Sequence, residues 1–321
     1  MMRRAGAVVT LSRALSGSNA ASPYRLLQAT GLSTRPAWPL QELWRDAVAA
    51  RSAAVSSKAA WTVFFSVAAA STLPHMANAQ EATPLEILSQ KNLVLYQYEA
   101  CPFCNKVKAF LDYYKIPYNV VEVNPIGKKE IKWSEYKKVP ILTVDDEQMN
   151  DSSAIIDQLY RKINPGKQSP DESNEETRWR SWVDNHLVHV LSPNIYRSTA
   201  EAVEAFEYIT KHGAFTFTER LVSKYAGAAA MYFISKKLKK KYNITDERAA
   251  LYEAVETWVD ALEGRNYLGG SKPNLADLAV FGVLRPIRHL QSGKDMIEHT
   301  RIGDWYARME QSVGESSGIK G

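Results

Sequence analysis

Two cysteines are the residues of this 321-residue chain best placed to do chemistry. Cys101 and Cys104 follow an apolar, β-prone stretch, and apolar side chains then recur at helical spacing. Cys101 therefore falls at the start of a helix, with Pro102 in the first turn, where a missing N–H costs nothing. The free N–H groups and the helix dipole favour the nucleophilic thiolate at Cys101. Cys104, one turn further in, is placed to attack a mixed disulfide on Cys101.

Other uses of the cysteine pair fit the sequence less well. A zinc site needs two further ligands, and the chain has no other cysteine and no HxxxH pair at finger spacing. A structural disulfide across so short a loop would constrain little of the unfolded chain. Because a strand, CxxC and a helix in succession are typical of thioredoxin-like proteins, the sequence predicts thiol or redox chemistry.

Residues near the cysteines in sequence are candidates for the same site. Tyr98 ends the strand and could hydrogen-bond to the Cys101 thiolate, or it is an ordinary half-buried tyrosine. Phe103 is either a wall of a ligand pocket or a core residue.

Two later motifs could bind a peptide thiol. A cis bond between Val139 and Pro140 would free the Val139 backbone to pair with an extended peptide such as glutathione, whereas a trans turn proline is the alternative. Asp151 and Ser152 are predicted to cap a helix. The same N–H groups and the Ser152 hydroxyl would bind the α-carboxylate of a γ-glutamyl group, and Asp151 its ammonium. Capping alone is the alternative.

Two groups further along the chain are weaker candidates. His186 and His189 lie one turn apart on one helix face, with Ser192 a turn beyond, so a metal or haem contact competes with surface or core positions. The lysines of residues 236–241 end another helix. They are either solvated cations near its dipole or a contact for an anionic ligand or a membrane surface.

The elements that position these residues form two predicted domains. Residues 84–164 are predicted to fold as a thioredoxin-like α/β domain of order βαβαββα, whose first two strands are parallel because a helix intervenes. A polar linker over 165–177 and an all-helical domain over 178–315 follow, with no strand after residue 165. The predicted strands are 93–98, 118–123, 139–144 and 148–150. The predicted helices are 84–90, 102–115, 128–138 (short and solvent-facing), 151–163, 178–191, 199–212, 216–225, 228–241, 245–262, 274–290 and 305–313.

The N-terminal segment differs in composition from the rest. The formal net charge of the chain is +5, but residues 1–80 carry +6, which leaves the body at about −1. The body therefore has no basic excess that would argue for a nucleic-acid partner. Residues 1–58 are rich in Arg, Ser and Ala, which predicts a transit peptide, mitochondrial rather than plastid; a disordered extension is the alternative.

An apolar stretch over residues 59–73 follows. Its fifteen residues fall short of the roughly twenty that cross a bilayer. A marginal anchor, a cleaved signal region and a helix on the membrane surface compete, and we expect membrane association.

With these residues in place, the chain resembles the prostaglandin E synthase 2 family of the glutathione S-transferase superfamily. The resemblance covers about residues 84–310. It rests on Tyr98-Glu-Ala-Cys-Pro-Phe-Cys104, Val121-Glu-Val-Asn-Pro125, Lys138-Val-Pro-Ile-Leu142, Asn150-Asp-Ser-Ser153, Leu187-Val-His-Val-Leu-Ser-Pro-Asn194, Tyr225-Ala-Gly-Ala-Ala-Ala-Met-Tyr232 and Gly269-Gly-Ser-Lys-Pro-Asn-Leu-Ala-Asp-Leu.

The resemblance implies a glutathione-transferase fold, a homodimer and membrane association through the N-terminal segment. It implies Cys101 as the catalytic thiol with Tyr98 and Phe103 in its pocket. Glutathione would be held by Val139, Asp151 and Ser152, and His189 and Ser192 correspond to positions linked to haem. Lys237 and Lys241 stand where animal members have two arginines, which keeps the charge but loses the bidentate fork.

The reaction implied is isomerisation of the prostaglandin H2 endoperoxide to prostaglandin E2. The Cys101 thiolate would attack or polarise the peroxide, and Tyr98 would stabilise the thiolate or protonate the developing alkoxide. The sequence identifies no base for the proton on carbon. Two alternatives remain: a glutathione-dependent thiol–disulfide oxidoreductase or transferase that uses Cys104 as resolving thiol, and a haem- and glutathione-binding membrane protein without turnover.

Overall fold

The computed structural model describes residues 82–125, 127–166, 174–212 and 217–320. The segments predicted as a transit peptide (1–58) and as a membrane-associated stretch (59–73) lie outside these residues, as does most of the predicted linker. Within the described part, no helix is both long enough and apolar enough to cross a bilayer.

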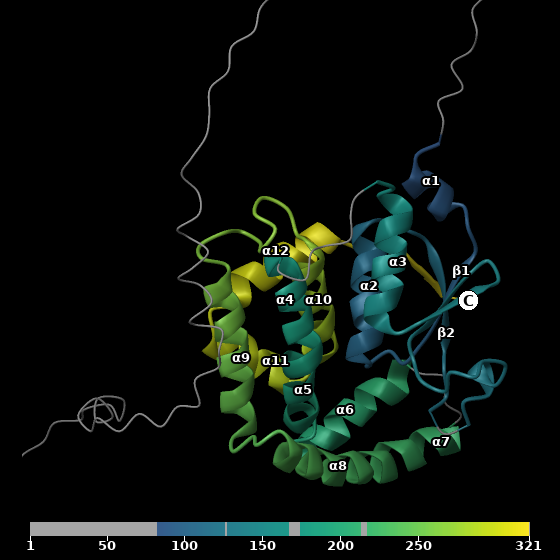
Figure 1. Ribbon diagram of the computed structural model, residues 1–321. Coiled ribbons are helices and arrows are strands. Elements are labelled where there is room, and N and C mark those ends of the chain that lie inside the picture. Colours follow the sequence, from purple (N-terminus) through teal and green to yellow (C-terminus); the bar gives the residue numbers. More distant parts are fainter. Residues whose placement is uncertain (1–81, 126, 167–173, 213–216, 321) are drawn as a thin grey trace, which may run out of the picture. The chain divides into compact units, whose positions relative to one another are not determined.

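A five-stranded mixed sheet forms the first domain, with the strand order β4–β3–β1–β2–β5 (Figure 1). At its centre β1 (Leu93–Gln97) runs parallel to β2 (Tyr118–Glu122), as predicted, and antiparallel to β3 (Ile141–Val144). β3 turns back into β4 (Glu147–Asn150). At the other edge β5 (Gly318–Lys320) pairs parallel with β2, so the prediction of no strand after residue 165 is wrong. Three residues are too few for an alternating pattern to be recognised.

Three helices belong to this domain: α1 (Pro84–Ser89), α2 (Pro102–Tyr113) and α3 (Ser152–Ile163). α2 and α3 lie side by side against the sheet, on the side that faces the helical domain (Figure 1). The short helix predicted over 128–138 is reduced to a single 3₁₀ turn, Lys129–Ile131. Ile131 is fully buried, so this turn packs inward rather than facing solvent as a whole.

The second domain is helical, as predicted. It comprises α4 (Glu175–Trp182), α5 (Val188–Ile195), α6 (Thr199–His212), α7 (Phe217–Val222), α8 (Ala228–Lys241), α9 (Glu247–Ala261), α10 (Leu275–Leu284), α11 (Gln291–His299) and α12 (Gly303–Val313). Two π-helical turns, Val183–Leu187 and Ser223–Gly227, join α4 to α5 and α7 to α8.

The structure differs from the predicted helices in two places. The helix predicted over 274–290 ends as α10, because Pro286 in the following 3₁₀ turn (Arg285–Ile287) has no N–H to continue it. α11 was not predicted, although it buries Met296. Its two large apolar residues, Met296 and Ile297, are adjacent, so they give no helical periodicity over the nine positions.

The two domains share one hydrophobic core, in which α10 crosses α2 at close range. Gly282 allows this contact, because a Cβ there would lie 2.6 Å from the Lys106 Cα. Beside it the Lys106 ammonium, 2% exposed, pairs with Asp184 at the start of the α4–α5 π turn. Ser153 bonds both of these side chains. α2, which begins at the cysteines, is therefore fixed on both faces.

Candidate active site around Cys101

Cys101 occupies the turn between β1 and α2, where the backbone holds it in a fixed position. Its N–H donates to the Tyr98 carbonyl at 2.9 Å. Its own carbonyl accepts from the Asn105 side chain, which also donates to the Glu99 carbonyl. Cys101 is the N-cap of α2 and Pro102 is in its first turn, which confirms the predicted helix start. The sulfur therefore lies where the first N–H groups of the helix are free to stabilise a negative charge.

The two thiols are held in opposite states. A hydrogen bond from the Cys104 side chain, with those from the backbone N–H groups of Cys104 and Phe103, lowers the pKa of Cys101 although burial opposes it. Burial raises the pKa of Cys104, which is 0% exposed. Both residues are free thiols. Cys101 is thus the thiol of the pair that ionises more readily, and Cys104 is the one that keeps its proton.

The Cys101 residue opens onto a cavity of about 430 Å³ that is lined by both domains. Tyr98, Cys101 and Phe103 contribute from the α/β domain. From the helical domain, the lining includes the predicted His189 and Ser192 of α5, together with Tyr196, Phe206, Met231 and Tyr242. Apolar and aromatic side chains make up most of this wall, which suits an apolar ligand with a few polar groups.

Tyr98 lines this cavity with a protonated phenol. Burial raises the pKa of Tyr98, and the nearby charges of Cys101 and Cys104 raise it further. The phenol therefore stays protonated at neutral pH and can donate a hydrogen bond. Tyr136 lies near the same thiols, since the pKa of its hydroxyl is raised by burial first, then by Asp151 and the two cysteines.

His189 faces the cavity, whereas His186 does not belong to its lining. The His189 ring stacks on Tyr242, with centroids 4.3 Å apart and planes 15° from parallel. Burial lowers the pKa of His189, and the charge of Lys241 lowers it further, so the imidazole is neutral near pH 7. His186 packs instead toward Trp182, with ring centroids 5.5 Å apart.

The predicted glutathione residues Val139, Pro140, Asp151 and Ser152 do not line the 430 Å³ cavity. The Val139–Pro140 bond is cis, as predicted, and Val139 packs with Tyr98 against a small core cluster. Asp151 caps α3 through Oδ1, which accepts from the Ser153 and Ala154 N–H groups at 3.0 and 3.1 Å. The other oxygen, Oδ2, takes no part in these two bonds. Ser152 is buried at the first position of the helix.

The two lysines predicted to contact a cofactor are not brought into the cavity. Lys237 and Lys241 are both exposed on α8 and absent from the lining. Lys241 reaches the rim only indirectly, with its ammonium 5.0 Å from the ring centroid of Tyr242.

Glu122 is a cavity residue that was not predicted from the sequence. It ends β2, lines the cavity and accepts hydrogen bonds from the Glu99 N–H at 2.8 Å and from Gln97 at 3.1 Å. Burial raises the pKa of Glu122 to about 7, and these hydrogen bonds only partly oppose it. A carboxylate directly after the apolar pair Val120 and Val121 was the available signal. Its meaning depends on the pairing of β1 with β2, which the sequence does not state.

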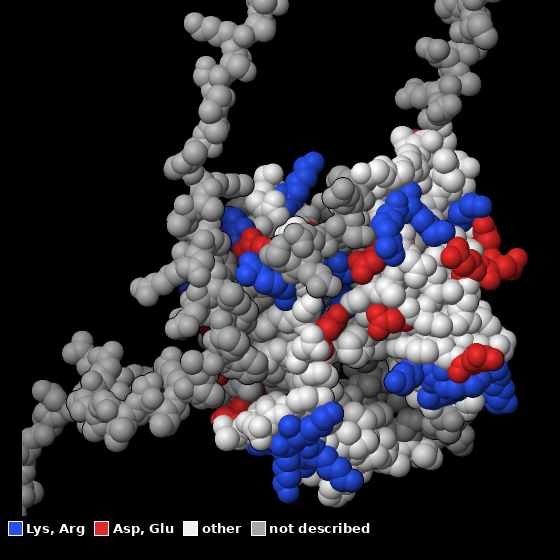
Figure 2. Space-filling view, viewed as in Figure 1, with Lys and Arg blue, Asp and Glu red and all other residues white. Residues whose placement is uncertain are grey.

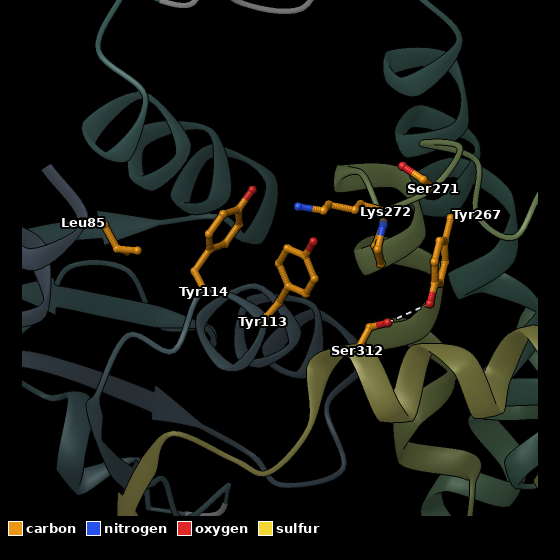
Figure 3. A pocket seen from close by; sticks show the side chains of 8 residues that line it. Leu85, Tyr113, Tyr114, Tyr267, Ser271, Lys272 and Ser312 are labelled. Carbon is orange, nitrogen blue, oxygen red and sulfur yellow. Dashed lines mark hydrogen bonds between the residues drawn. The ribbon is translucent and has the colours of Figure 1, made fainter. Parts of the chain in front are cut away.

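A second cavity, of about 440 Å³, lies apart from Cys101 (Figure 3). Tyr113 and Tyr114 at the end of α2 face Lys272 and Ser271 across it, and Tyr267 bonds Ser312 at its side. None of the predicted site residues lines this cavity. The Cys101 cavity is therefore the candidate active site.

Comparison with known proteins gives two concordant results. Sequence profiles of the glutathione S-transferase N-terminal and C-terminal domains match residues 95–167 and 241–308. Prostaglandin E synthase 2 of Danio rerio is 43% identical over 295 residues, which are 75% of this chain and 76% of that protein. The Mus musculus protein of that name is 41% identical over 288 residues, 75% of each chain. Human glutathione transferase theta-2, solved with glutathione and an unknown ligand, aligns at 19% identity and a TM-score of 0.45, over 70% of this chain and 83% of that one.

Proposed function

Since this chain belongs to the prostaglandin E synthase 2 family of the glutathione S-transferase superfamily, we propose that it isomerises the prostaglandin H2 endoperoxide to prostaglandin E2 in a glutathione-dependent reaction. One observation carries the proposal: Cys101, whose pKa is lowered, opens onto a largely apolar cavity formed by both domains. An apolar lipid that carries one reactive peroxide matches such a cavity.

The reaction needs a nucleophile and two proton movements. The Cys101 thiolate attacks one peroxide oxygen and forms an S–O bond, while the O–O bond breaks and its electron pair stays on the other oxygen. That alkoxide takes up a proton and becomes the hydroxyl. A base then removes the hydrogen from the carbon that bears the S–O oxygen. The electron pair of the broken C–H bond forms the second bond of the carbonyl group. The S–O bond breaks at the same time, and its electron pair returns to the sulfur. Tyr98, protonated and in the cavity wall, donates a hydrogen bond to the thiolate or to the alkoxide.

Glutathione would bind beside this site through the residues that the sequence predicts. The backbone of Val139 next to the cis proline would pair with its peptide part, and the N-terminus of α3 at Ser152 would hold its α-carboxylate. The Asp151 Oδ2, not used by the cap, would take its ammonium. When bound, glutathione supplies a second thiol near Cys101.

A second candidate is thiol–disulfide exchange, and the position of Cys104 favours it. The Cys101 thiolate would attack a disulfide, form a mixed disulfide and release one thiolate. Cys104 would lose its proton, attack the Cys101 sulfur and release the second thiolate. Two molecules of glutathione would then reduce the Cys101–Cys104 disulfide.

Haem is a candidate ligand of the same cavity, as the family resemblance implies. The neutral imidazole of His189 and the hydroxyl of Ser192 belong to its wall, so the donor types suit a haem contact. A Soret band in the purified protein that is lost in His189→Ala would support this ligand, and an unchanged band would exclude His189 as its contact.

Membrane association and a homodimer belong to the same proposal. α7, α8 and the π turn between them expose the large apolar side chains of Leu221, Val222, Tyr225, Phe233 and Ile234. Five lysines within residues 236–241 end the same helical run, and Figure 2 shows basic side chains gathered near this end of α8. This combination suits an anionic membrane surface. Phe233→Ser should weaken sedimentation of the full chain with phosphatidylserine vesicles, and equal sedimentation would contradict this contact.

Sedimentation equilibrium tests the proposed homodimer, and the mass of a monomer would refute it.

The deciding experiment compares the wild-type chain with Cys101→Ser and Cys104→Ser in two assays. Prostaglandin H2 isomerisation should be abolished by Cys101→Ser and spared by Cys104→Ser. Glutathione-coupled disulfide reduction should be lost in Cys101→Ser and slowed in Cys104→Ser. Disulfide reduction without isomerisation above the spontaneous rate would favour the second candidate, and neither activity would favour ligand binding alone.

A further inference from the structure

A buried polar cluster lies beneath the Cys101 loop, at the ends of β1 and β2. Its members are Gln97, Glu99, Lys108 and Glu122, and Gln97 and Glu122 are direct partners in the parallel strand pair. Gln97 is 0% exposed and bridges the two carboxylates, because its Nε2 donates to Glu99 at 2.9 Å and to Glu122 at 3.1 Å.

The two carboxylates of this cluster are in different situations. Glu99 has its own cation, since the Lys108 ammonium lies 3.1 Å from it. Glu122 instead lines the cavity, held by the two hydrogen bonds from the Glu99 N–H and Gln97. A buried carboxylate whose nearest cation is bound to another acid is costly to ionise. Glu122 is therefore a group that can hold a proton or release it near neutral pH.

The surroundings of Glu122 are those of a proton carrier rather than of a structural ion pair. The titratable groups that sense its charge are Tyr98 and both thiols, and those that affect it include Glu99 and Lys108. Glu122 and Cys101 face one cavity from neighbouring strand ends. A substrate that fills this cavity would therefore have both Cys101 and Glu122 in the wall around it.

We propose that Glu122 is the catalytic acid and base of the isomerisation, an inference that rests on the proposed function. Protonated Glu122 gives its proton to the alkoxide that forms when the Cys101 thiolate breaks the O–O bond. The resulting carboxylate removes the hydrogen from the carbon that bears the S–O oxygen. The carbonyl forms, the electron pair of the S–O bond returns to sulfur, and Glu122 is again protonated. The cycle consumes no proton and needs no further reactant.

This cycle predicts that the isomerisation rate first rises and then falls as the pH increases. The active form combines a Cys101 thiolate with a protonated Glu122. Activity should rise with pH as Cys101 ionises and fall again as Glu122 loses its proton, with an apparent pKa of about 7 for the alkaline limb. Glu122→Asp keeps a carboxyl group and should keep such a limb at a reduced rate.

The test combines three measurements on wild type, Glu122→Gln and the control Glu130→Gln. Glu130 is another half-buried acid that accepts a backbone N–H, from Asn124 at 3.0 Å, but it does not line the cavity. Glu122→Gln should lose about 10²- to 10⁴-fold in isomerisation. The rates of Cys101 alkylation by iodoacetamide and of disulfide reduction should stay within about threefold of the wild-type rates, because the thiolate needs no acid partner in these two reactions. Glu130→Gln should match wild type in all three.

Two outcomes would overturn the proposal while the proposed function stands. Isomerisation by Glu122→Gln within about threefold of wild type would show that the carboxyl group moves no essential proton. An equal loss of isomerisation, disulfide reduction and alkylation would show that Glu122 acts only through the Cys101 thiol. If the wild-type chain itself fails to isomerise while it reduces disulfides, the proposed function falls and the proton cycle falls with it.

Discussion

The pKa of the thiol is lowered at Cys101 and raised at Cys104, although the two residues lie within one helical turn. Cys101 receives hydrogen bonds at the helix start, whereas Cys104 donates one and is surrounded by apolar atoms. The Cys104 thiol therefore stabilises the thiolate form of Cys101. The CxxC spacing predicts the position of Cys101 at the helix start, whereas the burial that raises the pKa of Cys104 depends on tertiary packing.

The first prediction concerns this hydrogen bond. Cys104→Ala removes the main group that lowers the pKa of Cys101, so the alkylation of Cys101 should require higher pH than in wild type. Cys104→Ser keeps a hydroxyl donor, so the pH that the alkylation of Cys101 requires should rise less than in Cys104→Ala. The rate of iodoacetamide modification between pH 5 and 10 measures both. Equal profiles for the two variants would mean that the backbone N–H groups alone stabilise the thiolate.

Other residues of the site could not be predicted at this scale. Glu122 gains its role only when β2 pairs with β1 and when the helical domain closes over the strand ends. The aromatic wall of Tyr196, Phe206 and Tyr242 reads in sequence as ordinary helical core. Conversely, Lys237 has a charge suited to a ligand but lies on an exposed helix face. Residue type indicates possible chemistry, whereas only the tertiary structure decides which side chains meet.

Among the elements, the α4–α5 segment shows what periodicity can and cannot predict. A helix through this region was predicted, and it exists, from Glu175 to Ile195 with a π-helical turn at Val183–Leu187. The extra residue of a π turn rotates the next helical segment relative to its position in a regular helix. His189 and Ser192 come after the turn and line the cavity, whereas His186 lies within it and does not. Apolar spacing gives the helix but does not locate such a turn.

The second prediction concerns the crossing of α2 and α10. A Cβ at position 282 would lie 2.6 Å from the Lys106 Cα and 2.8 Å from the Asn105 carbonyl, and these backbone atoms cannot turn away. Gly282→Ala should therefore lower the free energy of unfolding by about 1–3 kcal/mol, although alanine is the better helix former. Urea denaturation measures this change.

Gly303→Ala is the matched control for that variant. Its added Cβ would meet only the Ile297 Cγ2, at 3.9 Å, so helix propensity should keep stability equal or raise it by up to about 1 kcal/mol. If both variants were equally stable, α10 would have room to move away from α2, contrary to the close packing described.

For the whole molecule, Asp112 connects three regions that are distant in sequence. This side chain is 0% exposed and accepts hydrogen bonds from Tyr118 in β2, from Arg285 after α10 and from the Ser317 N–H just before β5. The α/β domain, the helical domain and the C-terminal strand therefore meet at one carboxylate. The two domain types were predictable from their periodic patterns, but this connection was not, because no local pattern links residues so far apart.

The third prediction concerns this carboxylate. Asp112→Asn keeps only one of the two side-chain oxygens and puts an NH2 group in place of the other, and the Arg285 guanidinium, whose side chain is 26% exposed, loses its counter-charge. The free energy of unfolding should fall by about 3 kcal/mol. Asp260→Asn, which disrupts an exposed pair with Arg301, should change it by less than about 1 kcal/mol. Equal losses in urea denaturation would show that burial of the Asp112 pair is without energetic effect.

The pairing of β5 with β2 also constrains the order in which the protein can assemble during synthesis. Tyr118 and Ser316, which are hydrogen-bond partners beside this pair, are separated by 198 positions along the chain. While the ribosome is still making the helical domain, the outer edge of β2 has no strand beside it, and an open edge can pair with another nascent chain. Closing so long a loop is among the slower events of folding. The α/β domain, although it is encoded first, is therefore completed last.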